Sequence, residues 1–413
     1  MNTEERKNIQ RGWFVLALLF VVALLNYLDR TMISTMRGSI ISSIPMTEAQ
    51  FGLLTSVFSW VYGACCPIAG FIADRFKKTY IIIGSLFVWS TATLLTGYVT
   101  TYEELFATRA LMGISEAFFI PAALSIIMES HKKPSLAIGI LFSGEMIGSS
   151  LGFLGGRIAE HQSWNEAFHI FGWIGIAYAA FLIFTLKETT PFGRKEKGQP
   201  QESKASVGTT LRALFGKRSF YYLLCIYPLP TIVSWMVMGW LPTYYQEQFH
   251  LSQTSAGEYA TAFLYPLSII GLLMGGFLTD NWQKKYPYAR IVVPIIGLAV
   301  AAPSVFMIGY VNVLWVVVAL FMVYGFARMF IDTNLMPILC MVIDGRHRAT
   351  GFGIINMLTV FTGGMSTYVA GALRDAHVSL GTVFQYASLG LVLCMLLLLL
   401  VKRDVKKNQF KNE

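Results

Sequence analysis

Twelve apolar segments, each about 20 residues or longer, recur along the 413-residue chain and limit the folds open to it. An α-helix rises about 1.5 Å per residue, so about 20 apolar residues cross the hydrocarbon core of a bilayer. Only 13% of the residues are charged, against about a quarter in soluble domains. We therefore predict an all-α membrane protein. Its twelve spans are expected at residues 12–36, 50–72, 79–100, 104–128, 135–157, 167–187, 219–245, 256–279, 290–310, 313–340, 349–373 and 381–401.

The first apolar segment is too long for a signal peptide, and no small-residue cleavage site follows it. We therefore expect that no signal peptide is cleaved and that this segment is the first span.

Positive charge is concentrated in alternate connections. Of the 32 Lys and Arg residues, 26 fall in the two tails and in the connections after even-numbered spans, counting the span-end residues Lys187 and Arg290, and three fall after odd-numbered spans. By the positive-inside rule this bias predicts that both termini are cytoplasmic. It also explains the net charge of +9 without a nucleic-acid partner. The compact loops and the basic inner face favour a bacterial inner membrane with anionic lipids.

Gly70 and Asp74 recur as Gly276 and Asp280, 206 residues further on, which is half of the chain length. This offset indicates two six-helix halves in parallel orientation, an architecture typical of transporters. The polar segment between the halves cannot bury a core and is expected to be a linker. The predicted divisions are an N-terminal half at 1–187, a cytoplasmic linker at 188–218 with a short amphipathic helix near 209–215, a C-terminal half at 219–401 and a cytoplasmic tail at 402–413.

Ionisable residues lie inside the first and fourth spans. Asp29 and Arg30 are in or near the end of the first, where a charged group costs at least a few kcal/mol and usually marks an ion or substrate path. Arg109, Gly113 and Glu116 share one face of the fourth, at i, i+4 and i+7. A structural set of ion pairs and a ligand or proton site both remain open. We favour the site, because four ionisable groups at similar depth exceed what packing needs.

Further polar residues lie in other spans. Glu145 is in the middle of a glycine-rich fifth span, either as a ligand or proton site or as a residue hydrogen-bonded within the helix seam. Arg328 and Asp332 have the i, i+4 spacing of an intrahelical ion pair, and a structural and a functional role are both open. Asn356 is a polar side chain on an otherwise apolar, glycine-rich span.

Proline and aromatic residues mark the fourth and seventh spans. Pro121 is expected to bend the fourth. The sequence WLPTYY at 240–245 ends the seventh, as an aromatic belt at the membrane interface or as a gate over a cavity.

Residue patterns typical of enzymes and metal sites are missing from the sequence. The six histidines form no cluster, and no glycine-rich phosphate loop is found. We expect no catalytic residues, no metal and no cofactor other than a proton gradient. The half-length repeat also disfavours a channel. The cysteines all lie in apolar segments, without disulfide or metal spacing, and are expected to be buried thiols: Cys65, Cys66, Cys225, Cys340 and Cys394.

The loop at 74–78, DRFKK, resembles the cytoplasmic signature between the second and third helices of the major facilitator superfamily. The resemblance implies the major facilitator fold of twelve helices. In that superfamily the aspartate caps or pairs with neighbouring helix ends and steadies the outward-facing state. A role in conformational switching is thereby implied for Gly70, Asp74, Arg75 and Asp280, while Lys77 stands where a glycine is common.

Four stretches also resemble the anion:cation symporter family within this superfamily, which includes galactonate, glucarate and hexuronate transporters and the sialin branch. They are NYLDR at 26–30, WVY at 60–62, RALMGISE at 109–116 and WLPTY at 240–244. The resemblance implies that Asp29 and Glu116 match the family's proton-coupling carboxylates. It implies that Arg30, Tyr62 and Asn356 match its substrate-contacting positions.

Arg109 matches an arginine of that family that partners the coupling acids, and we include it among the candidate substrate-binding residues. Glu145 is included too, although sugar-acid members often carry a glutamine there. Arg328 and Asp332 lie in a span that is usually uncharged in the family.

We expect a proton-coupled symporter of a small organic anion, a sugar acid such as a hexuronate or aldonate, acting as a monomer by alternating access. The expected partners are this anion, H⁺ and membrane lipid. NYLDR at 26–30 and GISEA at 113–117 also resemble the Spinster family. That resemblance implies the alternative, a transporter of lysolipids and sphingolipids.

Overall fold

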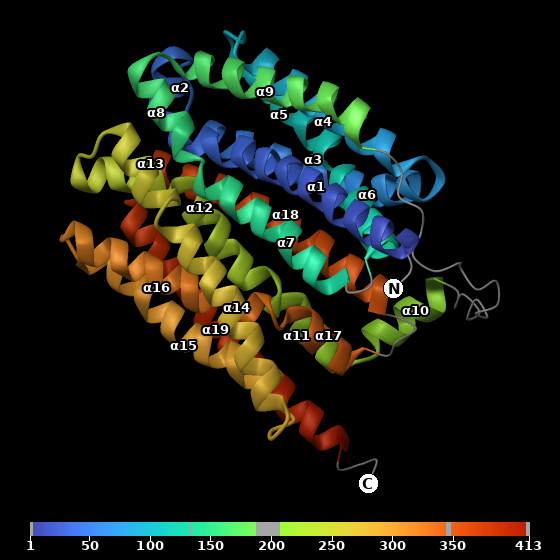
Figure 1. The fold of residues 1–413 in the computed structure, drawn as a ribbon. Coiled ribbons are helices and arrows are strands. Elements are labelled where there is room, and N and C mark those ends of the chain that lie inside the picture. The colour runs from blue at the N-terminus through green and yellow to red at the C-terminus, as the bar shows by residue number, and fades with distance from the viewer. Residues whose placement is uncertain (1–2, 132–133, 187–206, 344–347, 410–413) are drawn as a thin grey trace. The chain divides into compact units, whose positions relative to one another are not determined.

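The structure is a computed structural model that describes residues 3–131, 134–186, 207–343 and 348–409. The described residues form helices and connecting loops without strands (Figure 1). Twelve segments among them are long and apolar enough to cross a membrane, which confirms the predicted class.

The chain divides into two compact units, one of Met1–Gln199 with His250–Ala262 and one of Pro200–Phe249 with Phe263–Glu413. The first unit contains α1 (Thr3–Thr35), α2 (Arg37–Ser43), α3 (Glu48–Arg75), α4 (Lys78–Thr96), α5 (Tyr102–Glu116), α6 (Phe119–Ser130), α7 (Pro134–Ser150), α8 (Phe153–His161), α9 (Trp164–Thr185) and α13 (Gln253–Thr261). The second contains α10 (Val207–Phe215), α11 (Arg218–Ile226), α12 (Pro228–Phe249), α14 (Leu264–Gln283), α15 (Ala289–Met307), the 3₁₀ turn η1 (Ile308–Tyr310), α16 (Leu314–Asp332), α17 (Leu335–Val342), α18 (Arg348–Asp375) and α19 (Leu380–Gln409).

The two units repeat the same helix packing. In the first unit, α1 packs on α7, α3 on α5, and α4 on both α5 and α9. In the second unit, the corresponding spans pair in the same way, with α12 on α18, α14 on α16, and α15 on both α16 and α19. The internal repeat inferred from the glycine and aspartate spacing is therefore a repeat of three-dimensional packing.

The helix α13 departs from the predicted division. It lies in the second half of the sequence, and the prediction places it in the C-terminal half at 219–401. The structure packs it on α8 of the first unit (Figure 1). Gln253 Oε1 accepts a hydrogen bond from Ser39 Oγ at 2.9 Å, and Gln253 Nε2 donates to Gly156 O at 3.2 Å. The backbone N–H of Thr254 donates to Glu160 Oε2 at 2.6 Å.

The linker and tail are described in part. Helix α10 confirms the predicted amphipathic helix near 209–215, with Leu214 buried and Leu211 and Phe215 exposed. The rest of the predicted linker up to residue 206 lies outside the described residues. The predicted tail from 402 continues as helix, because α19 runs to Gln409.

Three spans break at a fixed distance before a proline. Pro121, Pro266 and Pro337 are each the third residue of the second helix in their span, so each lies in a first turn that needs no intrahelical N–H. The residue four positions before each proline falls in the gap between the two helices. Its carbonyl would accept from the N–H of the proline in a continuous helix, and proline has no N–H. The predicted bend at Pro121 is confirmed as the break between α5 and α6.

Glycines bring α7 close to α1. A Cβ added to Gly148 would overlap the carbonyl oxygen of Leu24, and one added to Gly144 would lie 2.9 Å from Phe20 O. The predicted close-packing face of the fifth span is thus the face toward the first span. Gly139, on the same helix, has no heavy atom within 4 Å of such a Cβ.

The aromatic residues at the end of α12 are buried, so an interfacial belt is the wrong interpretation of them. Trp240 and Tyr245 are 0% exposed, and Trp240 Nε1 donates to Thr367 O at 3.1 Å. The Tyr244 ring lies 6.2 Å from Phe321 and 5.8 Å from Phe384, and these rings form part of the core of the second unit. The role of a gate remains a prediction.

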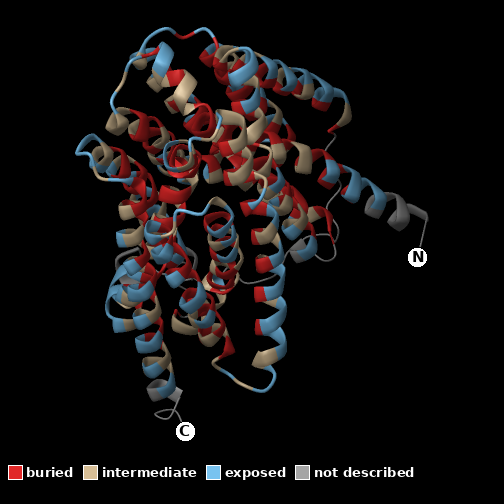
Figure 2. Cartoon of the chain, turned by 90° about the vertical axis from the view of Figure 1, so that its left-hand side faces the viewer, coloured by how far each residue is buried: buried red, intermediate tan, exposed pale blue. Residues whose placement is uncertain are grey.

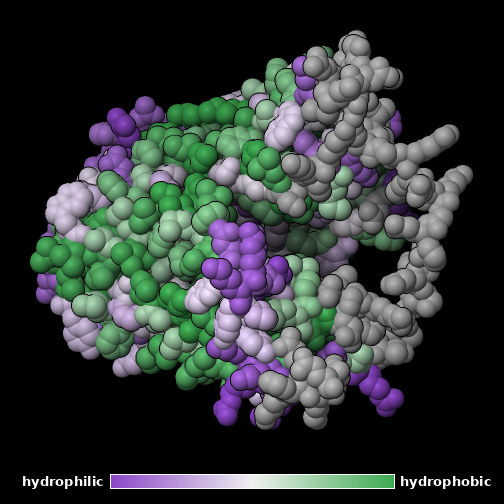
Figure 3. Space-filling view, turned by 60° about the horizontal axis from the view of Figure 1, so that its bottom comes forward, coloured by the Kyte–Doolittle hydropathy of each residue, from purple (hydrophilic) through white to green (hydrophobic). Residues whose placement is uncertain are grey.

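Buried residues lie on the helix faces that pack together, and exposed ones include many large apolar side chains (Figure 2). Hydrophobic residues cover most of the coloured face in Figure 3. Phe184 is 76% exposed and Phe277 is 72% exposed. A surface of this kind suits lipid as its solvent.

Candidate functional site

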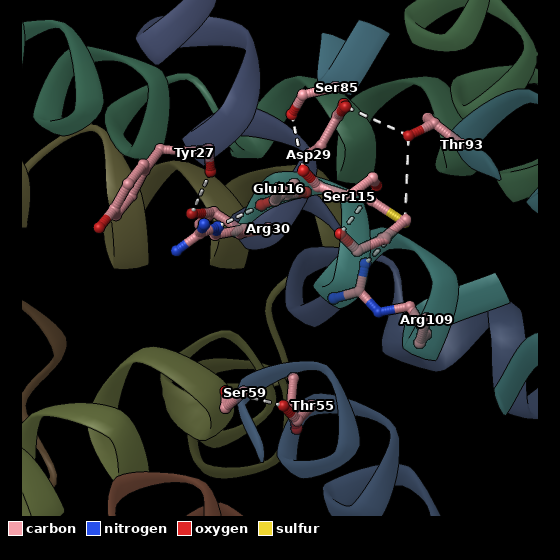
Figure 4. Close-up of polar contacts among 12 residues, drawn as sticks. Tyr27, Asp29, Arg30, Thr55, Ser59, Ser85, Thr93, Arg109, Ser115 and Glu116 are labelled. Carbon is pink, nitrogen blue, oxygen red and sulfur yellow. Dashed lines mark hydrogen bonds and ion pairs between the residues drawn. The ribbon is translucent and has the colours of Figure 1, made fainter. Parts of the chain in front are cut away.

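A partly buried ion pair joins the first and fourth spans in the first unit. Arg30 Nε, on α1, donates to Glu116 Oε2, on α5, at 2.6 Å (Figure 4). The Glu116 side chain is 0% exposed and that of Arg30 is 18% exposed. Glu116 is the last residue of α5, where the helix dipole disfavours a negative charge. The Arg30 guanidinium offsets that effect and gives the carboxylate a charge-assisted hydrogen bond.

Three aromatic rings surround the Arg30 guanidinium. Its Cζ lies 4.7 Å from the ring centroid of Tyr27, 4.9 Å from that of Phe58 and 4.7 Å from that of Tyr62. Each distance is within the range of cation–π attraction. Nη2 of Arg30 is buried and has no hydrogen-bond partner. The three rings thus pack around the guanidinium, and Nη2 is a donor without an acceptor in this arrangement.

Asp29 is buried beside this pair and is bound by a hydroxyl. Its side chain is 3% exposed, and Oδ2 accepts a hydrogen bond from Thr93 Oγ1, on α4, at 3.2 Å (Figure 4). Its Oδ1 has no partner. Asp29 and Glu116 are close enough to interact electrostatically.

Arg109 lies in the same cluster without an ion pair. It is 1% exposed, its Nη1 donates to Met112 Sδ at 3.6 Å, and its Cζ lies 5.4 Å from the Phe58 ring. No acid in the described part of the chain comes within the 4 Å of an ion pair with Arg109. Its charge acts on Asp29 and Glu116 from a longer distance. The partnership implied by the family resemblance is thus an electrostatic one in this structure.

Glu145 lies on α7 and is 8% exposed. It is close enough to the Arg30 guanidinium and the Tyr27 hydroxyl to interact with both. The cluster therefore combines three carboxyl groups with two guanidinium groups, so at least one proton or cation is needed for neutrality. Gly113 allows this assembly, because a Cβ there would lie 2.5 Å from Phe58 O.

The predicted residues of the second unit form a separate set. Arg328 Nη2 donates to Asp332 Oδ2 at 2.8 Å, as the i, i+4 spacing suggests. Close by in sequence, Tyr324 OH lies 3.0 Å from Ser234 Oγ. Asn356 is exposed on α18. The functions of these residues remain predictions.

The residues of the predicted switch loop are described in part. A Cβ at Gly70 would meet no heavy atom within 4 Å. Arg75 is exposed, with its Cζ 3.9 Å from the Phe71 ring, and Asp280 is exposed near the end of α14. The side chain of Asp74 lies outside the described part of the structure.

Sequence reasoning missed five residues of the cluster: Asn26, Tyr27, Phe58, Thr93 and Met112. Thr93 and Met112 have no distinguishing pattern in the sequence. Asn26 has one, because it precedes Asp29 by three residues and Arg30 by four and so shares their helix face. Among the described residues, no group of three or more His, Cys, Asp or Glu side chains could hold a metal ion. The chemistry available to the cluster is exchange of protons and of ionic partners.

Comparison with known proteins gives the family. Residues 19–367 match the Major Facilitator Superfamily. The chain is 28% identical over 302 residues to Protein spinster of Drosophila melanogaster, covering 70% of this chain and about half (49%) of that protein. It is 25% identical over 321 residues to the D-galactonate transporter of Escherichia coli O6:H1, covering 71% of this chain and 73% of that protein.

A solved structure shows the same fold. It is a bacterial homolog to the human lysosomal transporter Spinster, in an inward-facing and occupied conformation, with a TM-score of 0.80, 20% identity and 98% of each chain covered. The fold, the twelve apolar helices and the family match agree. The chain is a multi-pass membrane protein that belongs to the Major Facilitator Superfamily, and it is a transporter and not an enzyme.

Proposed function

We propose that this transporter is a proton-coupled symporter that imports a small organic anion, a sugar acid such as a hexuronate or aldonate, by alternating access. The observation that carries the proposal is the partly buried Arg30, which is paired with the fully buried Glu116 and has an unpartnered Nη2. A guanidinium presents donors in a planar fork that matches a carboxylate. The substrate anion would take the place that Glu116 holds.

Protons would control this exchange of partners. A buried carboxyl is disfavoured as an anion, so Asp29 and Glu116 are suited to take up protons from the side with the lower pH. Protonated Glu116 no longer holds Arg30 by charge, and the guanidinium becomes available to the substrate. After the transporter has opened to the other side, loss of the proton restores the Arg30–Glu116 pair and releases the anion.

Polar groups around Arg30 suit a substrate that carries hydroxyls as well as a carboxylate. Tyr27, Tyr62 and Glu145 lie beside the guanidinium and can donate to or accept from hydroxyl groups. The similarity to a D-galactonate transporter supports a sugar acid. Asn356 remains a predicted contact, and Gly70, Asp74, Arg75 and Asp280 remain predicted parts of the conformational switch.

A lysolipid or sphingolipid is the second candidate cargo. The similarity to Protein spinster and to the bacterial Spinster homolog favours it. The phosphate of such a lipid could also bind Arg30, so the binding of an anion alone does not separate the two candidates.

Transport by the full chain in proteoliposomes separates them. D-galactonate, D-glucuronate, a neutral sugar and a lysolipid would each be offered with and without an inward proton gradient. We expect concentrative, gradient-driven uptake of a sugar acid, lowered at least about tenfold in Arg30→Lys because the planar fork is lost. Arg157→Lys, at an exposed arginine of the same unit, is the control and should keep wild-type uptake. Transport of the lysolipid alone would establish the second candidate.

We also propose a bacterial inner membrane location, with both termini cytoplasmic, and a monomeric transporter. The distribution of Lys and Arg supports the orientation. Fusion of alkaline phosphatase or a fluorescent protein to the C-terminus tests it, since the enzyme is active only outside the cytoplasm.

A further inference from the structure

Asn26 is a buried polar residue whose side-chain atoms have no partner at hydrogen-bonding geometry, although its amide is close enough to the Glu116 carboxyl to interact with it. It is 1% exposed, and neither Oδ1 nor Nδ2 has a partner. Burying an amide without partners lowers stability, so native proteins rarely keep one without a reason.

The unpartnered atoms of Asn26 belong to a larger group. Oδ1 of Asp29 and Oε1 of Glu116 also lack partners, and all three side chains are buried. Asn26 and Asp29 lie on the same face of α1, and the Asn26 amide lies beside the Glu116 carboxyl. The polar atoms without hydrogen-bond partners are therefore concentrated around the Glu116 carboxyl, which is the group proposed to exchange its ionic partner.

Arg30 can satisfy Glu116 in one protonation state only. A guanidinium has donors and no acceptor, so it binds the carboxylate but cannot accept from the hydroxyl of the protonated acid. A side-chain amide has both functions: Nδ2–H donates to a carboxylate, and Oδ1 accepts from the acid O–H. Asn26 is the residue beside Glu116 with this property.

We propose that Asn26 is a positioning residue that holds the Glu116 carboxyl in either protonation state once Arg30 has turned to the substrate. This inference rests on the proposed symport. When Glu116 carries a proton, Asn26 Oδ1 accepts its hydrogen bond, and when the proton leaves, Nδ2 donates to the new carboxylate. Without Asn26 the carboxylate formed beside a substrate-bound Arg30 has no partner, so the proton stays on Glu116 and its release is slowed.

The test uses Asn26→Leu and Asn26→Ser in the full chain. Leucine has a shape similar to that of asparagine and no polar atoms, whereas the serine hydroxyl both donates and accepts. Ser90→Ala is the matched control, because Ser90 Oγ is also buried and unpartnered but lies on α4 against Gly175 of α9. Thermal midpoints, proton-driven uptake of radiolabelled D-galactonate and its exchange at equal pH would be measured for each.

For Asn26→Leu we expect an unchanged or higher thermal midpoint, because two unsatisfied polar atoms have been removed. Proton-driven uptake should fall at least about tenfold, as for the loss of a hydrogen bond to a charged group. Exchange at equal pH should stay within about twofold, because one anion can dissociate and another can bind while Glu116 keeps its proton, with no net proton movement. The alkaline limb of the uptake pH profile should move up by about one unit. Asn26→Ser should restore part of the uptake, and Ser90→Ala should match the wild type.

Two results would overturn the assignment of Asn26. One is a wild-type rate and pH profile in Asn26→Leu, and the other is a loss of uptake that parallels a lower thermal midpoint. In both cases the wild-type protein still accumulates D-galactonate with the gradient, so the proposed symport stands. If the wild type shows no proton-driven uptake, the proposed function fails and the role of Asn26 fails with it.

Discussion

Arg30 and Glu116 form an ion pair at 2.6 Å in which the Glu116 side chain is fully buried, whereas the Arg30 side chain is 18% exposed. The acid is therefore the fixed partner, and Arg30 is the one that can turn toward another anion. A substrate anion and the Glu116 carboxylate would compete for the same guanidinium.

Glu116→Gln should make anion binding independent of pH. Glutamine resembles the protonated acid, so Arg30 would be available to the substrate at any pH. We expect affinity for D-galactonate at pH 7.5 to rise by about tenfold, toward that of the wild type at pH 5.5, while proton-driven accumulation is lost. Isothermal titration calorimetry at both pH values checks the affinity. An affinity that still changes with pH in this variant would place the controlling proton elsewhere.

Asp29→Asn should separate proton coupling from substrate exchange. Asparagine keeps an oxygen that can accept from Thr93 Oγ1, so we expect a change in stability below about 1 kcal/mol. The variant cannot take up a proton, so concentrative uptake should be abolished while exchange at equal pH continues. Uptake and exchange are measured in the same proteoliposomes. Gradient-driven accumulation at the wild-type level would remove Asp29 from the coupling mechanism.

Alanine at two glycines of α7 should have opposite effects. At Gly148 a Cβ overlaps the Leu24 carbonyl, and forcing the two helices apart should cost about 1–3 kcal/mol. At Gly139 the Cβ enters open space, and the better helix propensity of alanine should stabilise by up to about 1 kcal/mol. Thermal denaturation of the purified variants in detergent gives the comparison. Equal midpoints for both would show that α1 and α7 separate easily.

His131 should make stability depend on pH. It follows α6 outside the spans, its Nδ1 lies 3.0 Å from Ser130 Oγ, and the Trp13 ring is packed against it at 5.2 Å. Burial lowers the pKa of His131, because the charged imidazolium is disfavoured there. The unfolded chain therefore binds this proton more readily, and the free energy of unfolding should fall as the pH drops from about 7.5 to 5.5.

The measurement for His131 is the thermal midpoint as a function of pH. In His131→Asn the loss of stability toward low pH should be smaller than in the wild type. His161→Asn, at an exposed histidine, should retain the wild-type dependence. If the thermal midpoint of His131→Asn changed with pH in parallel with that of the wild type, His131 would contribute nothing to the pH dependence of stability.

Much of the fold follows from signals that need no tertiary context. Apolar segment length gives the twelve helices, and the paired Gly70 and Gly276 give the repeat that the packing of both units shows. Pro121 marks its break because a missing N–H acts locally. The stretch at 240–245 was less predictable, since tyrosine and tryptophan are common both at interfaces and in cores, and burial depends on Phe321 and Phe384 from distant segments.

The candidate site was predictable in its charges and not in its partners. A charge inside a span is conspicuous in the sequence, so Asp29, Arg30 and Glu116 are found from position alone. Which of them pair depends on helix rotation, and the structure gives Asp29 a hydroxyl partner from Thr93. Arg109 likewise donates to a sulfur and not to an acid. Which side chains pair depends on shifts of a few ångströms in helix packing, and the spacing of residues along the sequence does not determine these shifts.

The helix α13 has a consequence for how the protein can be divided. Its residues are encoded after α12, yet Gln253 and Thr254 bind groups of α2 and α8. A gene cut once in the linker would yield a first fragment without its own final helix. Gly156 O and Glu160 Oε2 would then lose these donors, and the face of α8 that receives α13 would be left bare. In a split transporter the second fragment would have to supply α13 (Gln253–Thr261) to complete the first fragment.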